Sequence, residues 1–128
     1  MKQENYPAYT MLTNSALSNA LALECMIEAY IDEQETDLLN ILESAFCLAS
    51  EQIMIIRKIR DITESDRIPE VIRLSARSVG VSLMLSALSD LIDNEEKTEA
   101  IGELPEAILT MIKGCISSIK TIRCDLTT

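Results

Sequence analysis

Apolar residues recur every three or four positions along four long stretches of the chain, and this spacing predicts four α-helices. We place the helices at roughly residues 15–31, 37–62, 68–92 and 105–124. Short polar stretches separate them, and short connections make consecutive helices antiparallel neighbours. The pattern therefore predicts an all-α fold, a single-domain antiparallel four-helix bundle with up-down-up-down topology over residues 1–128. We expect residues 1–12 to form a loosely ordered N-terminal segment.

Several side chains near the expected helix starts support these boundaries. Thr13 and Asn14 offer oxygens that can cap the first helix, and Thr36 can cap the second. Pro69 falls in the first turn of the third helix, where the missing N–H of proline costs nothing. Pro105 marks the expected start of the fourth helix.

The expected third helix carries two apolar stripes in place of one. The first stripe consists of Ile72, Ala76, Val79 and Leu83, and the second of Leu74, Val81, Leu85, Leu88 and Ile92. A helix that is apolar on two sides is either central in its bundle or shared with a second protein chain. We therefore predict a homodimer, with the second stripe as the candidate self-association face.

The composition supports long helices and a packed core. Hydrophobic residues make up 48% of the chain, which is enough for a core, and the length fits one domain. Aromatic residues make up only 3%, whereas sheet proteins favour aromatic and β-branched side chains. With three glycines and three prolines, the chain has few signals for turns, so its elements are expected to be few and long.

The charges are unevenly distributed along the sequence. The net charge of −10 repels nucleic-acid backbones and anionic membranes, so we expect neither as a direct partner. In an antiparallel bundle the first and third connections share one end, which gathers carboxylates there as a candidate partner-binding acidic end: Asp32, Glu33, Glu35, Asp37, Asp93, Glu95, Glu96 and Glu99. The opposite end is expected to be basic. Solvation and the ordinary preference of acidic residues for helix starts are the alternative explanation.

The residues that usually carry enzyme or metal chemistry are sparse. There is no histidine, which excludes the commonest general base and histidine-containing diiron sites. The cysteines at positions 25, 47, 115 and 124 form no CxxC pair, so we expect reduced thiols and neither a zinc site nor disulfides. We identify no glycine-rich phosphate loop and no EF-hand spacing. The sequence thus predicts no catalytic residue, no metal and no cofactor.

The first residues and the apolar runs indicate where in the cell the protein is expected. Residues 1–10 contain no signal-peptide core, and the strongest apolar run, residues 79–88, is short for a membrane span. We therefore expect a cytoplasmic protein that does not bind membranes.

Three hypotheses of function follow from these observations. The first is a non-enzymatic protein–protein interaction module, such as a small regulator, adaptor or secretion-type chaperone, acting as a homodimer. The second is an acidic inhibitor, immunity protein or nucleic-acid mimic that binds a basic target. The third is an enzyme that uses carboxylates alone.

Overall fold

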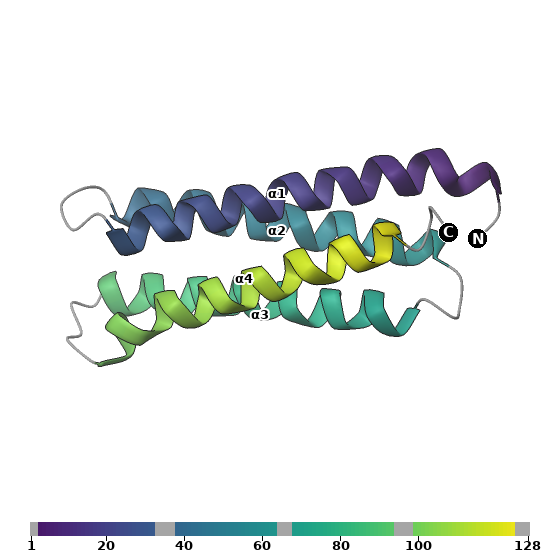
Figure 1. The fold of residues 1–128 in the computed structure, drawn as a ribbon. Coiled ribbons are helices and arrows are strands. Elements are labelled where there is room, and N and C mark those ends of the chain that lie inside the picture. The colour runs from purple at the N-terminus through teal and green to yellow at the C-terminus, as the bar shows by residue number, and fades with distance from the viewer. Residues whose placement is uncertain (1–2, 33–37, 64–67, 94–98, 125–128) are drawn as a thin grey trace.

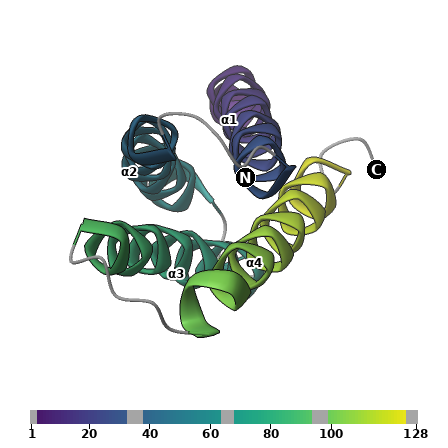
Figure 2. The ribbon, with the colours of Figure 1, turned by 90° about the vertical axis from the view of Figure 1, so that its left-hand side faces the viewer.

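The computed structural model describes residues 3–32, 38–63, 68–93 and 99–124. A short 3-10 turn, η1 (Gln3–Asn5), precedes the four helices of the bundle: α1 (Tyr6–Asp32), α2 (Leu38–Ile62), α3 (Ile68–Asp93) and α4 (Glu99–Cys124). Consecutive helices pack against each other, and α1 also packs against α4, which closes the ring. Figures 1 and 2 show the helices running alternately up and down around a common axis. The predicted antiparallel four-helix bundle is confirmed.

The predicted bounds of α2 and α3 are each within one residue of the observed ones, whereas α1 and α4 begin earlier than expected. α1 starts at Tyr6, well before the expected start near Ser15, because Tyr9 is fully buried and joins the core. Thr13 lies inside the helix instead of capping it, and its hydroxyl donates to the Tyr9 carbonyl oxygen at 2.9 Å. Residues 6–12, expected to be loosely ordered, are therefore part of α1.

α4 begins before the proline that was expected to mark its start, and it contains that proline. α4 begins at Glu99, and Pro105 lies within it. A proline inside a helix removes one backbone hydrogen bond and is normally unfavourable. Here the ring of Pro105 is buried, so apolar burial offsets part of that cost. The expectation that the helix starts at Pro105 was wrong for this reason.

The core runs along the bundle axis and is built from aliphatic side chains. All four helices contribute, and the largest fully buried side chains are Tyr9, Ile27, Leu42, Ile56, Ile59, Leu74, Leu85, Leu88, Ile108, Ile112, Ile119 and Ile122. Full burial of such a side chain contributes about 1.5–3 kcal/mol, so the fold depends chiefly on these contacts.

Two of the long-range hydrogen bonds in this core tie α1 to its neighbours. The Tyr9 hydroxyl of α1 donates to the Ile122 carbonyl oxygen of α4 at 3.1 Å. Ile122 lies in the last turn of α4, where carbonyl groups lack partners within the helix. The Gln52 side-chain amide of α2 donates to the Ala16 carbonyl oxygen of α1 at 2.7 Å. Both bonds fix the position of α1 relative to its two neighbours.

Candidate interaction surface

The second apolar stripe of α3 faces the inside of the bundle. Leu74, Val81, Leu85 and Leu88 are buried, and Ile92 is partly buried against the same core. The neighbouring helices α2 and α4 cover this side of α3. These side chains are therefore not accessible to a second chain in this fold. Our assignment of this stripe as the self-association face is corrected accordingly.

The first stripe lies on the outward face of α3 instead. Ile72, Val79 and Leu83 are 47%, 38% and 65% exposed, and Ala76 is exposed between them. Their spacing of four, three and four residues places all of them on one side of the helix. A row of apolar side chains on a helix exterior is unusual in a soluble protein, where single exposed ones are common. We call Ile72, Ala76, Val79 and Leu83 the outer stripe.

The apolar character of α3 also appears at the level of the whole helix. By length and composition, α3 is apolar enough to cross a membrane. A core helix of a soluble bundle meets the same criterion. In α3 the apolar residues divide between the buried stripe and the outer stripe, so the helix is apolar on two opposite sides.

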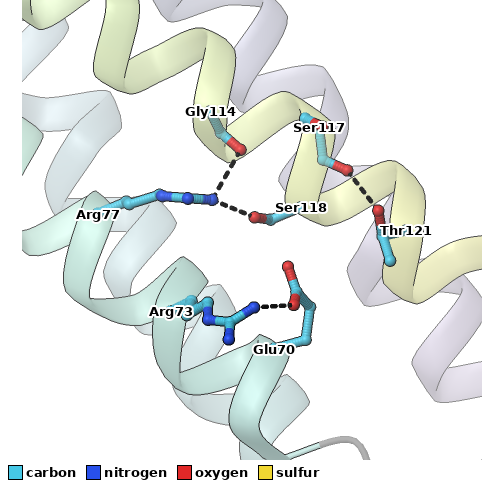
Figure 3. Close-up of polar contacts among 7 residues, drawn as sticks. All are labelled: Glu70, Arg73, Arg77, Gly114, Ser117, Ser118 and Thr121. Carbon is cyan, nitrogen blue, oxygen red and sulfur yellow. Dashed lines mark hydrogen bonds and ion pairs between the residues drawn. The ribbon is translucent and has the colours of Figure 1, made fainter.

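An arginine contact holds α3 against α4 beside the outer stripe (Figure 3). Arg77 Nη1 donates to Ser118 Oγ at 2.6 Å and to the Gly114 carbonyl oxygen at 3.4 Å. A Cβ atom on Gly114 would lie 3.6 Å from Arg77 Cδ, so the arginine side chain lies directly along the glycine. One turn earlier, Arg73 is exposed and pairs with Glu70 at 3.1 Å. The Arg77 contact joins α3 to α4, while the outer stripe lies on the exposed side of α3.

The charges separate along the bundle axis, as expected from the sequence and the topology. In the half that contains the end of α1 and the end of α3, the charged side chains that the structure describes are all carboxylates: Glu24, Glu28, Asp32, Glu43, Asp90, Asp93, Glu103 and Glu106. In the other half basic side chains predominate: Arg57, Lys58, Arg60, Arg73, Arg77, Lys113, Lys120 and Arg123. The molecule is therefore an electrostatic dipole along its length.

Few residues of the candidate acidic end can be located. Asp32 and Asp93 are exposed at the ends of α1 and α3, on the same end of the bundle. Glu33, Glu35, Asp37, Glu95 and Glu96 lie outside the described residues, as does the side chain of Glu99, the first residue of α4.

A small cavity of about 10 Å³ lies in the centre of the bundle and is lined by side chains from all four helices. Gln52, Ser78 and Cys115 contribute its polar atoms, and Ser78 Oγ lies 3.7 Å from Cys115 Sγ. Burial raises the pKa of the Cys115 thiol, which keeps it protonated and weakly nucleophilic. The cavity has about the volume of one water molecule, so it is too small for a substrate.

A larger, open groove lies between α1 and α2. It has a volume of about 1030 Å³, and its lining includes Tyr6, Met11, Glu51, Ile55 and Lys58. The lining combines Glu51 and Lys58 with several apolar side chains and with the uncharged polar residues Thr10, Asn14, Ser15, Ser18 and Asn19. The groove therefore suggests no particular ligand.

The thiols and carboxylates do not assemble into a metal centre in the part of the chain that the structure describes. Cys25 and Cys47 are exposed, whereas Cys115 is buried. No family model, no curated protein and no solved structure matches this chain. The interpretation of function therefore depends on the outer stripe and the charge distribution.

Proposed function

We propose that this chain is a non-enzymatic protein–protein interaction module that binds its partner through the outer stripe of α3. The observation that carries the proposal is the continuous exposure of Ile72, Val79 and Leu83 along one helix face. Covering the exposed parts of these side chains, at about 25 cal/mol per Å², contributes about 5 kcal/mol before the entropic costs of association. That gain is sufficient for a regulated, reversible contact when polar groups at the rim add to it.

The proposal is tested by affinity purification from a cell extract with identification of bound proteins by mass spectrometry. The chain is compared with Leu83→Glu, which places a charge at the most exposed position of the outer stripe. Met11→Glu on α1 is the matched control, because Met11 is 63% exposed and lies on another helix. We expect Leu83→Glu to lose a partner that the control and the original chain both retain at high salt. A set of bound proteins that does not change with Leu83→Glu contradicts the proposal.

The acidic half of the bundle favours a second candidate, an acidic inhibitor that binds a basic target. Exposed Asp32, Asp90 and Asp93 lie in that half. Binding through them would weaken steeply with added salt, mainly through a slower association rate. Replacing the three by asparagine removes charge without removing apolar surface. A partner that is lost with this triple variant and kept with Leu83→Glu supports the inhibitor over the interaction module.

A further inference from the structure

We propose that the partner of the outer stripe is a second copy of this chain, docked with the two α3 helices antiparallel. This inference rests on the proposed function and adds to it the identity of the partner and the geometry of the contact. It also assigns self-association to the exposed outer stripe, whereas the sequence suggested the buried stripe for this role.

The outer stripe is complementary to itself when it is rotated about a two-fold axis that passes near Val79. In such a pair the axis lies between Val79 and Gly80, and residues equally distant from that point in opposite directions face each other. Leu83, the most exposed member at 65%, then faces Ala76 of the second copy, and the reverse holds by symmetry. Ile72 faces the exposed Ala87 in the same way. Large side chains thus meet small ones along the helix, which permits close packing.

The charges that flank the outer stripe favour the antiparallel orientation over the parallel one. Arg73 lies beside one end of the stripe and Asp90 beside the other, and both are exposed. In this antiparallel register Asp90 of one copy lies opposite Pro69 of the other, about one helical turn from Arg73, whereas parallel docking brings like charges together. Antiparallel docking also brings the basic half of each bundle next to the acidic half of the second copy. Electrostatic complementarity of this kind fixes the register of an interface.

The expected dimer is weak. A stable interface usually covers about 800 Å² on each partner, and a single helix face covers less. We therefore expect dissociation in the micromolar range or above, and a monomer in dilute solution. The concentration range of the test has to extend to about 1 mM for this reason.

The test is sedimentation velocity, combined with light scattering, over about 1 µM to 1 mM of the full chain. We expect the mass to rise towards twice the chain mass of 14.2 kDa with increasing concentration. Leu83→Glu, Arg73→Asp and Asp90→Arg should each weaken the dimer by about tenfold or more. The double variant Arg73→Asp with Asp90→Arg restores opposite charges in the antiparallel pair and should return affinity to within about threefold of the original. Met11→Glu is the control and should leave the dimer unchanged.

Each alternative outcome has a defined meaning. A monomer at every concentration overturns the self-association. A dimer that the double variant does not restore overturns the antiparallel geometry, since only that geometry pairs these two charges. Circular dichroism of each variant separates loss of the dimer from loss of the fold. If the chain is monomeric while a different protein still depends on Leu83 for capture, the proposed function stands and the second copy is not the partner.

Discussion

Removing one hydroxyl group tests how the bundle closes between its first and last helices. Tyr9→Phe deletes the oxygen that donates to the Ile122 carbonyl oxygen at 3.1 Å and keeps the buried ring. The hydrogen bond itself contributes about 0.5–1.5 kcal/mol, and a buried carbonyl left without a partner costs about 1–3 kcal/mol. Because the end of α4 can fray towards water, we expect a loss near the lower part of these ranges, about 1–2 kcal/mol.

This loss is measurable by urea unfolding followed by circular dichroism at 222 nm. We expect a lower midpoint with an unchanged slope and a fall in Tm of about 4–7 °C, as is usual for a domain of this size. Backbone amides in the last turn of α4 should also exchange faster with deuterium. Tyr6→Phe is the matched control, since Tyr6 is 42% exposed and lies at the start of the same helix. A stability for Tyr9→Phe that equals that of the control would refute the role given to this hydrogen bond.

Four other predictions concern single residues. Gly102→Ala should stabilise the protein by about 0.5–1 kcal/mol in thermal unfolding, because Gly102 is exposed in α4 and a Cβ there meets nothing within 4 Å. Arg77→Ala should destabilise it by about 1 kcal/mol in urea and Arg73→Ala by less than about 0.5, since only Arg77 joins two helices; equal effects would contradict the contact shown in Figure 3. Cys25 should react with a thiol reagent in the native protein and Cys115 only after unfolding. Because burial raises the pKa of Cys115 above its ordinary 9.0, its contribution to stability is complete below that pH and should decline as pH rises beyond it.

The bounds of the helices show what the local spacing of apolar residues predicts and what it does not. The bounds of α2 and α3 follow from periodicity, because each is apolar at helical spacing along its whole length. The early start of α1 depends on a contact between Tyr9 and a residue 113 positions away, which no local pattern reveals. A weaker local signal was present nevertheless. Pro7 fits the first turn of a helix, and Tyr9, Thr13 and Ala16 continue its apolar spacing.

The outer stripe shows a second limit of sequence reasoning. Two stripes of similar hydrophobicity could each have faced the core, and the one predicted to bind a second chain is the one that faces the core. The two stripes differ in how far they extend along α3, and the stripe that faces the core has to extend along the whole bundle. The inner stripe continues without a break when the small buried Ser78 is counted between Leu74 and Val81. The outer stripe ends at Leu83 and is followed by Asp90, so it is too short to line the full core.

The closure of α4 on α1 also determines when this protein can finish folding during its synthesis. Ribosomes release the N-terminal part of a chain first, and a domain with sequential contacts can fold while translation continues. Here α1 packs against α4, and the hydroxyl of Tyr9 meets the carbonyl of Ile122. One face of α1 therefore lacks its native covering until α4 has been translated. The bundle is completed only after α4 leaves the ribosomal exit tunnel, so the nascent chain exposes apolar surface of α1 until then.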